Sequence, residues 1–487
     1  MPGLNAGLYI GLSGLQAQQA ALNVVGHNIA NVNTPGYTRQ RADLTANKSV
    51  VEGQLFFGSG VTLNAVQGIR DRFLDLQIYE ETARQTGANE RYSGVNAVAT
   101  SLGDTGPTGI AAQIQDFFQG FQDLAAQPEN GALRTNLVGK AQTMIAGLQT
   151  RYRVLDEQRN SADQSVASLV ANVNSLTDQI AQLNQRITTE TTQGSDNDAR
   201  DQRKSLTDKL AGLVGINVFE GSTGEYQITL DSGNAVLVNG NSSYALRTTT
   251  GGAPDNHLGI ESVMGTSVVD VTSSIKNGQL GGKLDLRDNI LAGFQQQLDE
   301  IAAGLASQMN LQHTQGFDLN GVAGQDFFGV NGANGANGLP PGTTAAPPYK
   351  GMVNALSVNA NLVAAPSLIA AAAAAAPGDN GNANKLANIQ FTGGTLAAGV
   401  VLGDSFSSSV GSLINDVGTT SQKWNAQNTT LQNLVTALQA QRDQISGVSL
   451  DEEAANMMTL QRGYQASARF ISVINQLTDQ LVNSFGK

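Results

Sequence analysis

Three histidines are the side chains best suited to acid–base or metal chemistry near neutral pH. They are His27, His257 and His313, and they are scattered along the chain. None lies at the His-x-x-x-His spacing, or beside the spaced carboxylates, that a metal site needs. We therefore expect each of them to be a polar surface or turn residue, not a general base or a metal ligand.

Two short segments look like reactive sites, but each lacks an essential residue. Ser405, in Gly403–Phe406, resembles the nucleophile block of a lipase-like hydrolase family, yet no histidine follows it to activate the hydroxyl. Gly278–Lys283 is one residue short of a phosphate-binding loop, and Leu284 stands where Ser or Thr would hold magnesium. The sequence thus predicts no catalytic, cofactor-binding or metal-binding residue, and an enzyme is the least favoured class.

Composition limits the partners of the chain. Its formal net charge is -12, which opposes binding to phosphate backbones, so we expect no nucleic-acid partner. The Ala-rich run at 362–376 is too short and too weakly apolar to span a bilayer, so we expect no membrane insertion. Cysteine is absent, which excludes disulfides and thiolate metal sites. The amino terminus lacks a basic secretory signal, so export would need another route.

Heptad patterns at both ends of the chain predict the helices that would position any functional surface. Residues 1–38 contain no Asp, Glu, Lys or Arg, and apolar residues recur there every seven positions. Similar rows follow residue 450, and such rows lie along one side of a helix. We expect two long helices that pair and need further partners, with these core positions: Leu8, Leu15, Leu22, Ile29, Met457, Leu460, Tyr464, Ile471, Ile474 and Leu481.

Further heptad helices in the middle of the chain enclose segments with strand and turn patterns. The expected fold class is mainly α with β insertions: an elongated multidomain rod with a terminal coiled coil, a helical-bundle body and small outer β domains. We expect a terminal assembly domain (1–45 and 447–487), a helical body (46–215, 284–315 and 405–446), a small β insertion (216–283) and a Gly/Asn/Ala-rich outer β/loop domain (316–404).

The first helix should end at a turn rich in Asn. Pro35-Gly36 fits the two central positions of a type II turn, and Thr34 before the proline is disfavoured in a helix. Near the other end, Asp451, Glu452 and Glu453 follow Ser449, and we interpret them as a helix start in which acids favour the positive end of the dipole. An intersubunit contact by these acids is the less favoured alternative.

The turn motif also carries a family resemblance. Its residues are Asn28, Asn31, Asn33, Thr34, Pro35, Gly36 and Tyr37. With Gly11–Leu15 before it, the motif is similar to the amino-terminal motif of bacterial flagellar rod, hook and hook-associated proteins. Thr38–Gln40, Gly447–Ala455 and Gln461–Gln465 most resemble the hook-associated family that begins the hook–filament junction. Alone, the turn would be ordinary Asn and Pro-Gly chemistry; its coupling to the matching carboxy-terminal motif favours the flagellar family.

The resemblance implies a structural adaptor subunit between hook and filament. It further implies export through the flagellar export apparatus, a location at the hook–filament junction, self-assembly through the terminal helices, and addition at the hook tip with the filament cap. Its implied partners are the hook protein, a second hook-associated junction protein and an export chaperone that binds the carboxy-terminal segment. The alternatives are another axial protein of the hook or distal rod, and a secreted coiled-coil adhesin.

Overall fold

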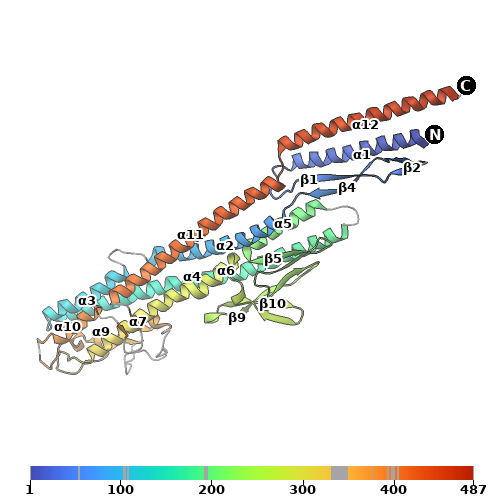
Figure 1. The fold of residues 1–487 in the computed structure, drawn as a ribbon. Coiled ribbons are helices and arrows are strands. Elements are labelled where there is room, and N and C mark those ends of the chain that lie inside the picture. The colour runs from blue at the N-terminus through green and yellow to red at the C-terminus, as the bar shows by residue number, and fades with distance from the viewer. Residues whose placement is uncertain are drawn as a thin grey trace.

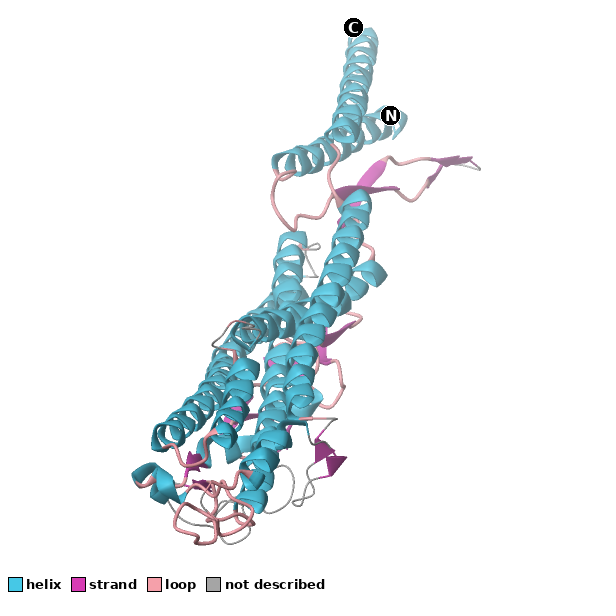
Figure 2. Cartoon of the chain, turned by 90° about the vertical axis from the view of Figure 1, so that its left-hand side faces the viewer, coloured by secondary structure: helices cyan, strands magenta, loops and turns pink. Residues whose placement is uncertain are grey.

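The computed structural model describes residues 2–52, 55–102, 106, 109–190, 196–330, 349–376, 378–391, 394–395, 401–402 and 405–485. They form a long rod of helices with small antiparallel sheets along it (Figures 1 and 2). Both chain ends lie at the same end of the rod. This architecture confirms the predicted fold class. The predicted loops at 331–338 and 347–348, and Gly403, lie outside the described residues.

The two ends of the chain form a pair of antiparallel helices. They are α1 (Pro2–Ala30) and α12 (Leu450–Phe485). The antiparallel direction follows from their contacts, because Gly7 of α1 faces Ile474 whereas Gly14 faces Ser467. Helix α1 contains no Asp, Glu, Lys or Arg, and a helix without a charged face is poorly suited to stand alone in water, which favours its pairing with α12.

A β arm lies along another side of α1. Its base is an antiparallel ribbon of β1 (Gln40–Ala46) and β4 (Val61–Gly68), with a register shift between Asp43 and Leu44. Its tip is a hairpin of β2 (Val50–Glu52) and β3 (Leu55–Phe57). In Figure 1 the arm extends beside α1 toward the amino terminus. We call β1–β4 the arm, and α1, α12 and the arm together the terminal unit.

The body of the rod is a bundle of long helices. A π-helical turn at Leu286–Ile290 joins two of them without a break. Helix α11 (Phe406–Ser446) packs along α2 (Arg72–Leu102), the first helix of the body (Figure 1). The body helices are α2 (Arg72–Leu102), α3 (Ile110–Ala126), α4 (Gly131–Glu190), α5 (Asn197–Leu213), α6 (Gly278–Asp285), α7 (Leu291–His313) and α11 (Phe406–Ser446).

A β module covers one flank of α4. One sheet has the order β5-β6-β7-β8 and a second has the order β11-β10-β9, and all their pairings are antiparallel. Alternate residues of β5, such as Ile216 and Val218, point into a core shared with α4 and α5. The strands are β5 (Ile216–Glu220), β6 (Tyr226–Leu230), β7 (Val236–Asn239), β8 (Ser242–Ser243), β9 (Leu246–Thr250), β10 (Leu258–Met264) and β11 (Ser267–Asp270).

Short elements close the end of the rod away from the termini. An aromatic cluster of α3 and the following segments, including Phe117, Phe121 and Phe327, forms the core there. The short elements are β12 (Phe328–Val330), α8 (Met352–Ala355), β13 (Leu356–Val358), α9 (Ala360–Ala364), α10 (Gly381–Asn388), β14 (Gly394–Thr395) and β15 (Val401–Leu402).

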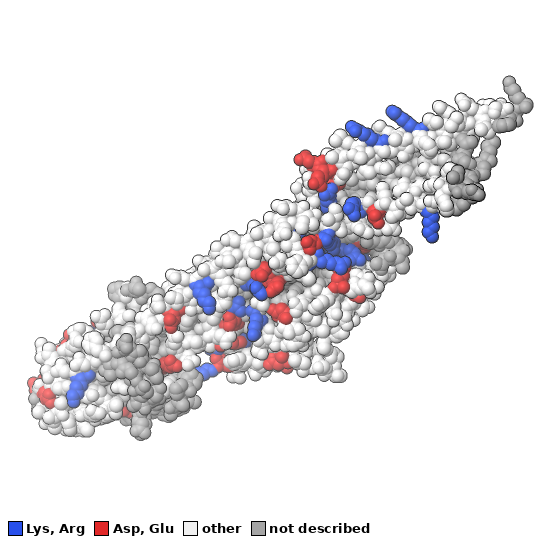
Figure 3. Space-filling view, viewed as in Figure 1, with Lys and Arg blue, Asp and Glu red and all other residues white. Residues whose placement is uncertain are grey.

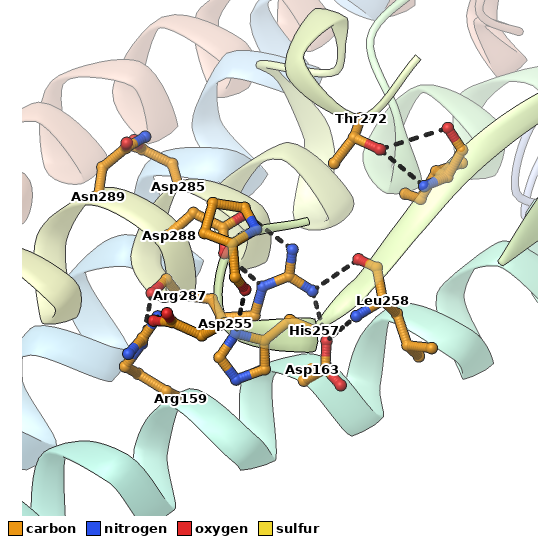
Figure 4. Close-up of polar contacts among 12 residues, drawn as sticks. Arg159, Asp163, Asp255, His257, Leu258, Thr272, Asp285, Arg287, Asp288 and Asn289 are labelled. Carbon is orange, nitrogen blue, oxygen red and sulfur yellow. Dashed lines mark hydrogen bonds and ion pairs between the residues drawn. The ribbon is translucent and has the colours of Figure 1, made fainter. Parts of the chain in front are cut away.

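A buried ion cluster fastens the β module to the body (Figure 4). Arg287, in the π turn, has no exposed surface and donates to the Asp163 carboxylate and, at 2.9 Å, to the Leu258 carbonyl. Asp163 also accepts the Leu258 N–H at 2.9 Å. One helical turn earlier on α4, Arg159 donates to Asp255 at 2.6 Å. Because buried charges are tolerated only when paired, these contacts fix the start of β10 against α4.

The expectation that each histidine is a polar surface or turn residue is wrong for His313, which is completely buried at the end of α7. Its Nε2 accepts the Ala370 N–H at 2.9 Å, so its Nδ1 carries the proton and donates to the Gln325 carbonyl. A spacing argument on sequence cannot detect this role, because both partners are backbone groups. Burial lowers the pKa of His313 to about 4. The ring is therefore a neutral structural bridge between α7 and the segments that follow it.

Candidate assembly interface

Small residues bring α1 and α12 into close contact. A Cβ atom on Gly11 would lie 2.6 Å from Cγ1 of Ile471, and one on Gly7 would lie 3.2 Å from Cδ1 of Ile474. A side chain at Gly11 would require Ile471 to move or the helices to separate, whereas one at Gly7 would require Ile474 to shift slightly. Further along the same side of α1, Ala21 and Val25 are buried as well. The contacting row of α1 therefore starts with glycines and ends with larger residues near the body.

The predicted core positions lie in and beside this contact. On α12, Ile471 and Ile474 touch α1 directly. On α1, the predicted apolar residues immediately follow positions 7, 14, 21 and 28, about 100° further round the helix. They flank the contact with α12 and do not form its centre. Tyr464 is exposed (38%), whereas the following are half-buried: Leu8, Leu15, Leu22, Ile29, Met457, Leu460, Ile471, Ile474 and Leu481.

The helix pair leaves a large apolar surface uncovered. Figure 3 shows few charged side chains over this end of the rod, while charges of both signs gather near its base. Exposed apolar side chains of this number and size mark an interaction surface in a soluble protein. On the described residues of the two helices they are Tyr9, Leu12, Leu450, Met458, Tyr464, Phe470, Val473, Leu477 and Val482.

The turn after α1 has the predicted type II geometry. The Tyr37 N–H donates to the Thr34 carbonyl at 3.2 Å, and Gly36 has φ of +82°, which only glycine adopts without strain. Asn31 Nδ2 donates to the His27 carbonyl at 3.0 Å and so caps the end of the helix. Asn33, Thr34, Pro35 and Gly36 are exposed, whereas Tyr37 turns back toward α1.

Asn28 is the centre of a set of contacts between the two ends of the chain. We call the contacts of Asn28, Tyr37, Arg39, Glu453 and Asp201 the joint. It is 1% exposed and satisfies its whole amide group. Nδ2 donates to the Gln40 carbonyl at 2.8 Å and to Glu453 at 3.2 Å. Oδ1 accepts the Gln40 N–H and the Tyr37 hydroxyl, each at 2.9 Å. One buried side chain thus ties together α1, the exit turn, β1 and the first turn of α12.

Arg39 completes the joint from the other side. Its Nε donates to Glu453 at 2.7 Å and its Nη1 to Glu452 at 2.6 Å, while its backbone N–H donates to the Ser446 carbonyl at 2.8 Å. The acids do lie in the first turn of α12, as predicted. Sequence reasoning missed that Glu453 is buried and bound to the opposite end of the same chain. The available signal was an arginine in one motif and acids in the other.

A second set of contacts fixes the joint to the body. Asp201 on α5 accepts the Thr38 N–H at 2.9 Å and Nη2 of Arg70 at 2.6 Å. Burial raises the pKa of the Tyr37 phenol above its ordinary value, and the charges of Asp201 and other nearby acids add to the increase, so the hydroxyl stays a donor. Clefts of about 770 Å³ and 470 Å³ flank the exit turn.

Membrane-spanning helices and metal clusters do not occur in the described part of the chain. No helix there is both long and apolar enough to cross a membrane. Within the same residues, no cluster of three or more His, Asp or Glu side chains is arranged to hold a metal ion. Ser405, considered above as a nucleophile, caps α11 by accepting the Ser408 N–H at 3.1 Å.

The chain is similar to flagellar proteins over almost its entire length. Residues 95–328 match the family described as "Flagellar hook-associated protein FlgK helical domain". Residues 8–38 match "Flagella basal body rod protein", and residues 439–484 match "Flagellar basal body rod FlgEFG protein C-terminal". The two rod-protein matches cover most of α1 with its exit turn, the end of α11 and most of α12.

Flagellar hook-associated protein 1 of Escherichia coli is 28% identical, with 97% of this chain and 98% of that protein covered. The protein of the same name from Bacillus subtilis is also 28% identical, with 99% and 98% covered. A solved structure, the flagellar hook junction protein FlgK from Burkholderia pseudomallei, has a TM-score of 0.65 at 19% identity, and covers 76% of this chain and 100% of that chain. At this level of identity, the structural similarity shows a shared fold and nothing about function.

A terminal unit made from both chain ends, with matches to axial proteins at each end, defines a member of the flagellar rod, hook and hook-associated proteins. Within that class, the helical-domain match and the nearly full-length relatives distinguish the subgroup. The chain belongs to the flagellar hook-associated protein 1 (FlgK) family.

Proposed function

We propose that this chain is a structural subunit of the bacterial flagellum that forms the hook–filament junction and connects the hook to the filament. The observation that carries this proposal is the terminal unit. Both chain ends combine there, the joint fixes them to the body, and an apolar surface remains uncovered. Membership of the hook-associated protein 1 family supports a location at the hook–filament junction. A rod-protein function is less favoured, because the match to a basal-body rod protein covers 13% of this chain.

The proposal includes export through the flagellar export apparatus and incorporation at the junction. The proposed partners are other copies of the chain, the hook protein, a second hook-associated junction protein, the filament cap during assembly, and an export chaperone on the carboxy-terminal segment. A subunit of this kind requires no catalytic residue, cofactor or metal. We therefore assign the chain no enzymatic activity.

Assembly would proceed through burial of the uncovered apolar face by neighbouring copies. Each large apolar side chain removed from water contributes about 1.5–3 kcal/mol, offset by the entropy of ordering the helices. Contacts of the head-to-tail kind repeat without closing on a pair, so they generate helical or ring lattices. The predicted heptad residues of α1 and α12 remain our proposal for the positions that drive this step.

A complementation experiment tests the function. A flagellated strain that lacks this gene should have hooks without filaments, and the unmodified chain should restore attached filaments. Ile471→Asp, which places a charge against Gly11 in the helix contact, should fail to restore them although the body stays folded. Gln476→Asp, at an exposed position of the same helix, should restore them. Attached filaments in the gene-deleted strain would refute the proposal.

A further inference from the structure

The tip of the arm is apolar and uncovered. Phe56 is 76% exposed, Phe57 49% and Val50 58%. A two-stranded ribbon has no core of its own in which to bury such side chains, and an isolated hairpin of this kind is marginally stable in water. Exposed phenylalanines at the end of a projecting ribbon are therefore anchors for another surface. We call Val50, Phe56 and Phe57 the arm tip.

A second uncovered apolar surface lies on the body. Phe73 (77% exposed) and Leu76 (43%) are on the first turns of α2, and Phe219 (59%) is on β5. The two elements lie side by side here, because Arg72 pairs with Glu220 at 3.0 Å. Glu80 lies one helical turn beyond Leu76, and Asn217 lies on the same face of β5 as Phe219. Because Glu80 and Asn217 line one cleft, the exposed side chains border the same surface. We call Phe73, Leu76 and Phe219 the body patch.

The arm tip and the body patch of one chain lie apart. The arm extends along α1 away from the body, whereas α2 starts at the base of the arm and extends into the body (Figure 1). Helix α1 has 29 residues and is therefore roughly 40 Å long. A second copy displaced by about that length along the rod would present its body patch at the level of the first copy's arm tip.

The charges near the two surfaces are compatible with this contact. Lys48 is exposed two residues before Val50 and forms no ion pair with any residue that the structure describes. Beside the body patch, between α2 and β5, is a cleft of about 560 Å³. Its charged lining residues are Glu80, Asp231 and Lys276. Glu80 pairs with Arg84 at 2.5 Å, whereas Asp231 forms no ion pair with any described residue. A lysine from the arm of a neighbour would find an acidic partner in Asp231.

We propose that the arm tip of one copy docks on the body patch of a second copy. The contact joins two different surfaces of the same chain, so it is head-to-tail and repeats along a lattice. It rests on the proposed function, because only an assembly of many copies brings the two surfaces together. In that assembly the arm links successive subunits, while the apolar face of α1 and α12 is left for other neighbours.

Disulfide trapping tests the contact without background, because the chain has no cysteine. The full-length chain carrying Phe56→Cys and Phe219→Cys is expressed in the gene-deleted strain, and isolated flagella are oxidised and analysed without reductant. A second variant carries Phe57→Cys and Phe73→Cys. The matched control carries Phe56→Cys with Phe391→Cys, which pairs the tip with an exposed phenylalanine outside the body patch (68% exposed). A disulfide requires Cα atoms within about 7 Å, so it reports direct contact.

The expected result is a ladder of cross-linked oligomers for at least one test pair and monomers for the control. The contact is overturned if the test variants enter flagella with filaments attached but cross-link no more than the control. A cross-linked dimer of the single variant Phe56→Cys would also overturn it, because tips would then meet tips. Absence of the unmodified chain from isolated flagella would instead refute the proposed function. The two failures are therefore distinguishable.

Discussion

Replacing Asn28 by alanine should open the terminal unit at its base. The amide makes four hydrogen bonds, and all of its partner groups come from other segments of the chain. The variant Asn28→Ala removes these bonds and leaves the buried N–H and carbonyl of Gln40 without partners. Each buried unsatisfied group costs about 1–3 kcal/mol. Glu453 keeps its contact with Arg39, so we expect a total loss of about 3–5 kcal/mol in the free energy of opening the joint.

Amide hydrogen exchange of the purified full-length chain measures this free energy locally. A loss of about 3 kcal/mol lowers protection by roughly 100-fold. The decrease should appear in peptides that cover the end of α1 and the first turns of α12, and peptides from the middle of α4 should not change. Asn23→Ala is the matched control, because Asn23 is an exposed asparagine on the same helix.

The reasoning would be refuted by equal protection in Asn28→Ala and Asn23→Ala. It would also be refuted if the joint peptides of the unmodified chain were unprotected, since the hydrogen bonds described above would then have no stabilising effect in the isolated chain. A loss of protection confined to the tips of α1 and α12 would show that the pairing of the helices, and not the joint, is the weak point.

Two further predictions concern the buried polar groups of the body. Asp163→Ala should lower the free energy of unfolding by about 3 kcal/mol, measured by thermal or urea unfolding. The reason is that fully buried Arg287 loses one of its carboxylate partners and the Leu258 N–H loses its acceptor. The control Asp156→Ala, at an exposed position of the same helix, should change the free energy of unfolding little. Protonation of His313 should destabilise the chain, because burial lowers the pKa of its ring to about 4. The stability that the neutral ring contributes is complete above about pH 6.5 and is lost as pH falls toward 4. The loss in the free energy of unfolding should be roughly 3 kcal/mol. His313→Gln, less stable at neutral pH, should lose less stability over that interval. The comparison is needed because Asp299, whose pKa burial raises to about 6, has the opposite effect, and its stability contribution is lost as pH rises.

Local sequence signals were sufficient for the helices and the exit turn. Heptad rows predict a long helix at each end because an apolar stripe must be buried, whatever its partner. Pro35-Gly36 predicts the type II turn because proline fixes one φ and glycine alone accepts the other. The division into four domains and the list of driving residues stay predictions.

The contact face of α1 could not be predicted from apolar residues. The heptad of large side chains attracts attention to Leu8 and Leu15, yet the helices approach each other through Gly7, Gly11 and Gly14. A glycine carries no hydrophobic signal, and its value is that it lets another backbone come close. Whether such a row faces a partner depends on where that partner lies, which periodicity does not contain.

The sequence by itself determined that this chain has two long terminal helices, a turn between the first helix and the rest, and the motifs of a flagellar axial family. Only the tertiary structure decided that Arg39 meets Glu453, 414 residues away, and that His313 is a buried bridge. Periodicity and turn chemistry act between near neighbours in the chain, so they can be read locally. Burial and charge pairing depend on how distant segments meet, and that is fixed only when the whole chain has folded.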